Sequence, residues 1–365
     1  MSSQLFFSQI DVKCNEKVKV MESRSVQKQD ERSKNLESWL KSYDEHHILY
    51  MQPMIGDASH RRYFRIHTTT GSYVAMDAPP HQENCHAFLN ISKALKTLGL
   101  VTPDIIKADL TQGFLLLTDF GDLTYLKALK HDNADQLYET ALHSLSILQS
   151  CQNIPNQPIP FFDQTWMWQE WAWHKEWFLG KLLGLSLSSH EKNLDEAFSF
   201  LVKSAIAQPQ VFIHRDYHSA NLMVLSNNRV GILDFQDAFI GPITYDLVSL
   251  LRDCYIHWPD TRIHQWVHHY YNSLLSKHIL PSSISFETFL YWFDLMGMIR
   301  HLKALFTFAR KHIRDHQSHY LQHIPRTLNY VITMSERYDP LAYLHQFMQK
   351  TVKPSYDEVL STCAQ

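Results

Sequence analysis

Short runs of alternating apolar and polar residues dominate the first third of the chain. Three of these runs are typical of strands, at residues 63–67, 73–77 and 113–118. A helical pattern at residues 85–98 separates the last two, and Leu36, Trp39 and Leu40 share one face of a shorter helix upstream. The pattern predicts a small β-rich N-lobe over residues 34–118, preceded by a flexible polar extension at residues 1–33.

Beyond Gly121 the pattern takes on the period of helices. Four apolar residues recur at the spacing of one helix face, namely Leu137, Ala141, Leu145 and Leu148. A Trp-rich helical stretch follows, and three short apolar runs then lie close together at residues 211–213, 222–225 and 230–233. We predict an α+β, bilobal fold. Its parts after the N-lobe are a hinge at residues 119–122, a larger and mainly helical C-lobe at 123–350 with a small central sheet, and a tail at 351–365.

Composition and charge narrow the class of protein. The 365 residues are 45% hydrophobic with a formal charge of −3, which argues against nucleic acid or an anionic membrane as partner. The 10 glycines include no G-x-G pair and no phosphate-loop motif, so a dinucleotide fingerprint and a Walker A loop are excluded. The 5 cysteines are widely spaced and odd in number, which is typical of reduced thiols and not of a disulfide framework or a zinc site. We expect a soluble, cytoplasmic protein that is a monomer or a weak dimer.

Polar residues with the chemistry of a phosphotransfer site stand at the ends of the three short runs. Asp216 follows the first run, Asn221 precedes the second and Asp234 follows the third, so three strands would bring them to one edge. Carboxylate and amide oxygens suit Mg²⁺, and the remaining Asp can accept a hydroxyl proton. The pattern His-x-Asp-x-x-x-x-Asn from His214, with Asp-Phe eighteen residues after Asp216, favours this interpretation over turn chemistry alone.

The segment His214–Asn221 together with Asp234 resembles the catalytic and metal-binding loops of the aminoglycoside phosphotransferase family, relatives of protein kinases. Other segments are more similar to one branch, the anomeric N-acetylmuramate/N-acetylglucosamine kinases of cell-wall recycling. These are Gly-Asp-Ala-Ser-His-Arg-Arg-Tyr-Phe-Arg at 56–65, Val-Ala-Met-Asp-Ala-Pro-Pro at 74–80, and residues 113–119, 176–181, 231–252 and 300–303. The resemblance covers residues 36–345 and implies a protein-kinase-like fold.

The resemblance also implies roles for residues of the C-lobe. Asp216 would be the catalytic base, and Asn221 and Asp234 would hold Mg²⁺. Asp237 either joins the metal site or only shapes the turn. The residues that would support the catalytic loop are His214 and Asp246.

For ATP, the resemblance implies a turn over the phosphates and backbone contacts to adenine. The turn would consist of Gly56, Asp57, Ala58 and Ser59, and the adenine contacts would come from Thr118, Asp119 and Phe120. The strand at residues 73–77 lacks the lysine that kinases use for ATP, so we predict that one arginine replaces it. The candidates are Arg61, Arg62 and Arg65, because a guanidinium can bind phosphate through two hydrogen bonds. Glu83 either orients that arginine or is an ordinary acid at a helix start.

The implied activity is ATP- and Mg²⁺-dependent phosphorylation of the anomeric C1 hydroxyl of N-acetylmuramate and/or N-acetylglucosamine, in peptidoglycan recycling. The small-molecule amino sugar is the expected partner, and the candidate substrate residues are Tyr217, His218, Arg300 and Lys303. The cations Arg300 and Lys303 would either receive a substrate carboxylate or lie on the surface over apolar neighbours. One alternative is an aminoglycoside or choline-like alcohol phosphotransferase, and a second is a nucleotide-binding pseudokinase scaffold.

Two further patterns each have a structural and a functional interpretation. The tryptophans 166, 168, 171, 173 and 177 either wall a sugar site or pack in the core. His312, His316, His319 and His323 recur on one face of an expected helix. That face would be either a zinc site or a solvated surface.

Overall fold

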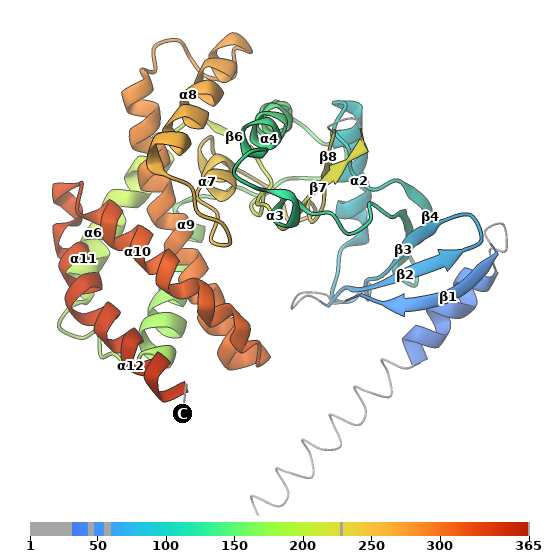
Figure 1. Cartoon of the computed structure of the whole chain (residues 1–365), viewed down its shortest axis with the longest axis horizontal. Coiled ribbons are helices and arrows are strands. Elements are labelled where there is room, and N and C mark those ends of the chain that lie inside the picture. The colour runs from blue at the N-terminus through green and yellow to red at the C-terminus, as the bar shows by residue number, and fades with distance from the viewer. Residues whose placement is uncertain (1–30, 43–46, 55–59, 227–228, 364–365) are drawn as a thin grey trace, which may run out of the picture. The chain divides into compact units, whose positions relative to one another are not determined.

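The computed structural model describes residues 31–42, 47–54, 60–226 and 229–363, which form two compact units (Figure 1). The N-terminal unit contains the described residues up to Cys85 together with Asp104–Asp119. The C-terminal unit contains His86–Pro103 and the chain from Phe120 onwards. Each unit is thus built from two separate stretches of the chain.

An antiparallel sheet of five strands forms the N-terminal unit, in the order β1-β2-β3-β5-β4. The strands are β1 (Ile48–Pro53), β2 (Arg62–Thr68), β3 (Ser72–Asp77), β4 (Ile105–Asp109) and β5 (Phe114–Thr118). A helix at residues 31–41 buries Leu36 and Leu40 against Phe64 and Ile66 of β2. The predicted amphipathic helix and the three predicted strands are confirmed, whereas β1 and β4 were not predicted.

Helices make up most of the C-terminal unit. The longer ones are α2 (Cys85–Thr97), α4 (Ala134–Gln149), α5 (Gln164–Trp173), α6 (Glu191–Ile206), α8 (Asp260–Ser276), α9 (Phe286–Asp315), α10 (Ile324–Ser335) and α12 (Lys353–Cys363). The shorter ones are α3 (Tyr125–Ala128), α7 (Tyr245–Leu251) and α11 (Ala342–Phe347). The described residues of this unit also form π-helices at His174–Leu182 and Met348–Val352 and 3₁₀ helices at Ser318–His323 and Asp339–Leu341.

The central sheet predicted for the C-lobe is instead two separate pairs of strands. Strand β6 (Gln210–Ile213) pairs with β9 (Phe239–Pro242), and β7 (Leu222–Leu225) pairs with β8 (Arg229–Ile232). The prediction of one sheet was wrong because β6 takes its partner from beyond β8. β6 and β8 are therefore not hydrogen-bonded to each other in one sheet, and other contacts must bring their ends together.

Helix α9 is the core element of the C-terminal unit. The side chain of Ser285 caps its start by accepting the N–H of Thr288 at 3.2 Å, and its apolar face buries Phe293 and Leu305 completely. The helix packs against α6, α7 and α10 (Figure 1). Lys303 in the middle of α9 lies 3.2 Å from Asp216, so one side of the helix faces the loop that precedes β7.

The structure adds detail to two of the expected segments and changes one expected helix face. Residues 86–103 group with the C-terminal unit, although the N-lobe was expected to extend over them. The expected tail contains α12, whose Tyr356 is buried and donates its hydroxyl hydrogen to the carbonyl of Leu321 at 2.8 Å. The expected histidine stripe is broken, because α9 ends at Asp315 and His316 adopts a left-handed backbone with φ of 56°.

Candidate active site

Backbone hydrogen bonds bring the predicted catalytic and metal-binding residues together across the two strand pairs. Asp216 lies after β6, Asn221 directly before β7 and Asp234 shortly after β8. The N–H of Leu233 donates to the carbonyl of Asn221 at 3.0 Å, and the amide Nδ2 of Asn221 donates to the carbonyl of Asp216 at 3.1 Å. The three residues thus occupy one connected loop system.

Asp246 holds the start of the catalytic loop. Its two carboxylate oxygens accept the backbone N–H groups of His214 at 2.6 Å and Arg215 at 3.0 Å. Arg215 has a left-handed backbone with φ of 77°, a conformation that costs free energy in a residue other than glycine. Burial raises the pKa of Asp246, and the nearby His214 and the two backbone bonds oppose that rise. The carboxylate is placed where it can offset the strain at Arg215.

His214 connects the catalytic loop to the segment that follows β8. Its Nε2 donates to the carbonyl of Leu233 at 2.8 Å, and its Nδ1 accepts the N–H of Asp216 at 3.3 Å. These two bonds define a neutral tautomer with the proton on Nε2. The backbone at Asp216 and the backbone just before Asp234 are therefore both bonded to the same imidazole.

A second buried carboxylate, Asp253, was missed by the sequence reasoning. One of its oxygens accepts both the N–H of Ser219, at 3.0 Å, and the hydroxyl hydrogen of Ser219, while the other accepts the N–H of Tyr255. Asp253 is nearly fully buried. Its only sequence signal is a lone acid in an apolar stretch seven residues after Asp246.

The residues predicted to hold Mg²⁺ offer oxygen ligands. The hydrogen bond from Nδ2 of Asn221 to the Asp216 carbonyl turns the amide oxygen of Asn221 the other way. Nε2 of Gln236 donates to Asp234 at 2.7 Å and to Asp237 at 3.3 Å, so the two carboxylates lie near each other. One amide oxygen and two carboxylates are ligands that Mg²⁺ prefers, so these residues fit that ion.

Two cations of α9 flank Asp216. Lys303 Nζ lies 3.2 Å from its Oδ1, and Arg300 Nη2 lies 3.8 Å from the same oxygen. Partial burial of Asp216, whose side chain is 38% exposed, would raise its pKa, but the charges of Lys303 and Arg300, followed by those of His218 and Arg215, outweigh it and hold the pKa below its usual range. The Asp216 carboxylate is therefore ionised at neutral pH and accepts a proton only weakly.

The guanidinium of Arg215 is occupied elsewhere. Its carbon lies 4.4 Å from the ring centroid of Phe239, and its Nη2 lies 3.6 Å from Oε1 of Glu170. Glu170 is buried, also accepts the indole N–H of Trp166 at 3.3 Å, and has an Oε2 atom without a hydrogen-bond partner among the described residues. Sequence reasoning missed Glu170, because nothing but its place in the Trp-rich helix distinguishes it.

Each arginine predicted to bind phosphate pairs with an acid in the N-terminal unit. Arg61 pairs with Glu83 at 2.7 Å, and both side chains are about nine-tenths buried. Arg62 donates through Nε to Asp77 at 3.0 Å, and Arg32 pairs with the same carboxylate. Arg65 pairs with Asp119 at 2.7 Å. The Arg61–Glu83 pair is the one in which the acid stands at the start of the helix after β3, as the sequence suggested for Glu83.

The remaining nucleotide residues are described only in part. Gly56, Asp57, Ala58 and Ser59 lie outside the described residues. Thr118 ends β5, and its backbone N–H donates to the carbonyl of Asp104 at 3.0 Å. Phe120 packs so closely on Gly231 that a Cβ there would lie 2.8 Å from its ring. Gly231 is therefore fixed by close packing of β8 on Phe120.

The other substrate candidates occupy different environments. Tyr217 is fully buried, and its hydroxyl donates to the carbonyl of Ala141 at 2.9 Å, so it packs in the core. His218 packs edge-on against Tyr255 at 5.6 Å, and its buried Nδ1 has no hydrogen-bond partner in the described parts of the chain. Burial lowers the pKa of His218.

The tryptophans divide between core and surface. Trp171 is buried and stacks on Phe198 at 4.8 Å, which makes it a packing residue. Trp166 and Trp173 are half-buried and meet edge to face at 6.3 Å on the side of α5 that carries Glu170. Trp168 and Trp177 are also half-buried, so of the five tryptophans only Trp171 is shown to be a packing residue.

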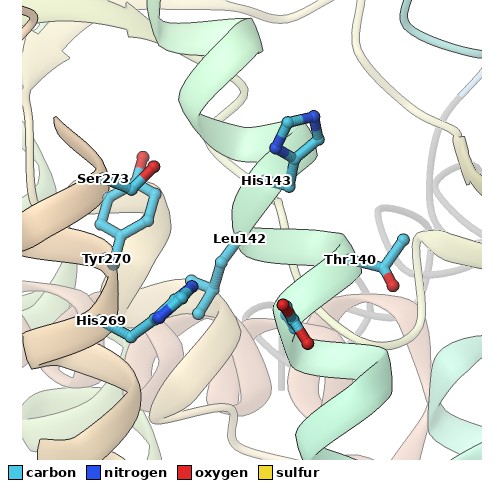
Figure 2. A pocket seen from close by; sticks show the side chains of 7 residues that line it. Thr140, Leu142, His143, His269, Tyr270 and Ser273 are labelled. Atoms are coloured by element: carbon cyan, nitrogen blue, oxygen red, sulfur yellow. The ribbon is translucent and has the colours of Figure 1, made fainter. Parts of the chain in front are cut away.

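Two further features of the described residues lie apart from the predicted site residues. A cavity of about 300 Å³ opens between α4 and α8, lined by Glu139, Thr140, Leu142, His143, His269, Tyr270 and Ser273, none of them a predicted site residue (Figure 2). Within the described residues, no three His, Cys, Asp or Glu side chains group in a way that could hold a metal ion, so the zinc alternative for the four histidines has no support there. None of the described helices is long and apolar enough to cross a membrane.

The fold and loops define a kinase-like phosphotransferase, and comparison with known proteins gives the family. Residues 51–277 match the profile of the Phosphotransferase enzyme family. The chain belongs to this family, and the resemblance inferred from the sequence is confirmed.

Relatives and solved structures are consistent with that assignment. The chain is 40% identical over 297 residues to an N-acetylmuramate/N-acetylglucosamine kinase of Pseudomonas aeruginosa, a match that covers 81% of this chain and 87% of that protein. A Neisseria meningitidis protein of the same name is 35% identical over 336 residues, covering 91% and 98%.

Solved structures of the same fold include the choline kinase LicA from Streptococcus pneumoniae, with a TM-score of 0.58, 14% identity and coverage of 82% of this chain and 99% of that chain. ADP-bound aminoglycoside phosphotransferase APH(2'')-Ib gives a TM-score of 0.56 at 13% identity, covering 82% and 98%. At such identities the likeness concerns the fold alone, and it confirms the predicted bilobal, kinase-like α+β class.

Proposed function

We propose that this protein is an ATP- and Mg²⁺-dependent kinase that phosphorylates the anomeric C1 hydroxyl of N-acetylmuramate and/or N-acetylglucosamine, in peptidoglycan recycling. The observation that carries the proposal is the pair of cations, Arg300 and Lys303, beside Asp216. Relatives with this substrate in their names, at 35–40% identity, support it further.

Charge distinguishes this acceptor from the alternatives. Aminoglycosides and choline are cations, and a pocket for them should place acidic groups near the catalytic base. Here Asp216 is surrounded by positive charge, which favours a neutral or anionic acceptor. The negative charge of the lactyl group on N-acetylmuramate is compatible with these surroundings, whereas a cationic acceptor would be repelled.

In the proposed reaction Asp216 orients the C1 hydroxyl and accepts its proton as the oxygen bonds to the γ-phosphorus. The anomeric hydroxyl is more acidic than an ordinary alcohol, so a carboxylate with a depressed pKa suffices, and positioning contributes most of the rate. His214 and Asp246 would hold the loop that carries Asp216.

Mg²⁺, when bound, would neutralise phosphate charge. Asn221 and Asp234 would hold it, with Asp237 beside them. For the nucleotide, we propose Arg61 as the replacement for the missing lysine, since it is the arginine paired with Glu83 at the helix start. The backbone of residues 118–120 and the turn at residues 56–59 would complete the nucleotide contacts.

The test is consumption of ATP with Mg²⁺ in the presence of N-acetylmuramate, N-acetylglucosamine, kanamycin or choline. Phosphorus NMR of the product identifies the phosphorylated position, and Asp216→Asn serves as the inactive control. We expect a sugar 1-phosphate that is absent in the control. Turnover of kanamycin or choline alone would contradict the proposed acceptor.

A further inference from the structure

Lys303 occupies an unusual position for a cation of a C-terminal helix. Its Nζ lies 3.2 Å from Oδ1 of Asp216, 87 residues away in sequence, and its side chain is only 15% exposed. Among the described residues, Asp216 is the only side chain to which this ammonium is bonded. The contact therefore joins the middle of α9 directly to the proposed base.

Arg300, one turn earlier on α9, is held differently. Its Nη1 donates to the hydroxyl of Tyr245 at 2.8 Å, and its guanidinium carbon lies 4.6 Å from the centroid of that ring. Tyr245 is fully buried, so Arg300 is anchored in the core and lies farther from Asp216, at 3.8 Å. Lys303 differs from Arg300 in chemistry, because its ammonium is a compact charge with three donors at the end of a four-carbon chain.

The reaction places an anion where this ammonium lies. An acceptor oxygen that is hydrogen-bonded to Asp216 would be two hydrogen bonds away from Nζ, and that oxygen is the one that bonds to phosphorus. The catalytic loop supplies no other cation to this point, because Arg215 is paired with Glu170 and stacked on Phe239. A preorganised cation at a developing anion is among the largest contributions to catalysis.

We propose that Lys303 is a catalytic residue that contacts the transferring phosphoryl group, and that it does not read the substrate carboxylate. This inference rests on the proposed function. In the step, the C1 oxygen forms a bond to the γ-phosphorus while the bond from that phosphorus to the bridging oxygen breaks. The electron pair leaves with ADP, the hydroxyl proton goes to Asp216, and Lys303 keeps its own protons throughout.

The two amino sugars separate this role from carboxylate recognition. N-acetylmuramate carries its carboxylate through an ether at C3, away from the reacting C1 hydroxyl, and N-acetylglucosamine has no carboxylate. A carboxylate reader affects only the first sugar, and it acts mainly on KM. A contact to the phosphoryl group affects kcat equally for both sugars, because the transferred group is the same.

The experiment compares Lys303→Met and Lys303→Arg with wild type on both sugars, by steady-state kinetics with Mg²⁺ and ATP. We expect Lys303→Met to lower kcat by ~10²-fold for both, with sugar KM values changed by less than about 3-fold. Lys303→Arg keeps the charge and should restore part of the loss. Lys311→Met is the matched control, since Lys311 lies on the same helix but bonds to the hydroxyl of Tyr320 at 3.0 Å.

Two results would overturn the inference: an unchanged kcat in Lys303→Met, or a loss confined to N-acetylmuramate through its KM. Thermal unfolding of both variants shows whether they fold, and Lys303→Arg preserves the test if the methionine variant does not. Failure of the proposed function looks different, because the wild type itself would then phosphorylate neither sugar.

Discussion

Replacing Asp246 by Asn tests whether a buried carboxylate sets the geometry of the catalytic loop. Asp246 accepts the N–H groups of His214 at 2.6 Å and Arg215 at 3.0 Å, one on each oxygen. Asparagine has the same shape but only one acceptor oxygen. Its NH₂ group must therefore face a backbone donor in a site that water does not reach.

The expected loss of stability follows from those two bonds. A hydrogen bond to a charged group contributes about 2 kcal/mol, and the surviving bond weakens by about 1 kcal/mol when its acceptor becomes neutral. Removing a buried charge recovers part of this, because burial raises the pKa of Asp246 and so opposes its ionisation. The net loss should be about 2 kcal/mol, or roughly 4 °C in the melting temperature of a unit of this size.

The variant should also lose most of its catalytic activity, although it remains folded. In Asp246→Asn the hydrogen bond that offsets the strained, left-handed backbone of Arg215 is weakened or lost. Asp216 is the next residue, so a change in the Arg215 backbone displaces it. A displacement of about 1 Å at the base costs ~10²-fold in kcat. Differential scanning fluorimetry and steady-state kinetics at saturating ATP measure the two effects.

A matched control makes the same chemical change on the surface. Asp357→Asn removes a carboxylate that pairs with Lys353 at 2.9 Å on the exposed face of α12, and it should leave both measurements unchanged. About 2 °C of melting temperature corresponds to 1 kcal/mol in a unit of this size, so the reasoning is refuted if Asp246→Asn melts within about 1 °C of wild type and keeps its full kcat.

Three further predictions concern the nucleotide, acid stability and the metal. Arg61→Met should raise the KM for ATP by ~10-fold. Arg61 and Glu83 form one buried pair, so the effects of Arg61→Met and Glu83→Gln on this KM should not add in the double variant. A larger rise of the KM in Arg62→Met would contradict the assignment of Arg61. Burial lowers the pKa of His174 to about 4 from 6.5, so the unfolded chain binds more protons between these values. His174 should therefore contribute about 2 kcal/mol less stability at pH 5 than at pH 7, in addition to the contribution of His301, whose pKa burial lowers to about 3. Urea unfolding at the two pH values should show a smaller difference in His174→Gln than in wild type, and an equal difference would disprove the reasoning. In wild type, chelation by EDTA should abolish turnover and added Mg²⁺ should restore it. Asp234→Asn should require at least ~10-fold more Mg²⁺ for the same turnover. An unchanged Mg²⁺ requirement would exclude Asp234 as a ligand.

Local patterns predicted the elements that bury one face. The helix with Leu36 and Leu40, the strands β2, β3 and β5, and the catalytic loop all have strong periodicity or distinctive spacing. Strands β1 and β4 escaped prediction because they are the edges of the sheet and none of their residues is fully buried. An edge strand whose two faces are exposed or only partly covered does not require apolar residues at alternate positions, so its sequence lacks the pattern that predicts a strand.

The supporting residues of the site depend on contacts that sequence spacing does not reveal. The pattern around Asp216 indicated the base, but its ion pair with Lys303 depends on how α9 crosses the unit. Asp253 and Glu170 are single acids in apolar surroundings, and the hydrogen-bond donors that contact them come from elements distant in the sequence or from residues with no distinctive spacing. The histidine stripe failed for a related reason, because a left-handed residue at His316 ended the helix that the spacing assumed.

The division of each unit into two stretches of chain has a consequence for synthesis. Helix α2 is made early, yet Phe88 on it packs against Phe235, 4.8 Å away in a segment that emerges much later, after the catalytic loop. Until then a face containing Phe88, Ile91 and Leu95 has no cover from that partner. A nascent chain stalled before β8 should therefore be a good client for a ribosome-bound chaperone, and truncation after residue 119 should yield a sticky fragment.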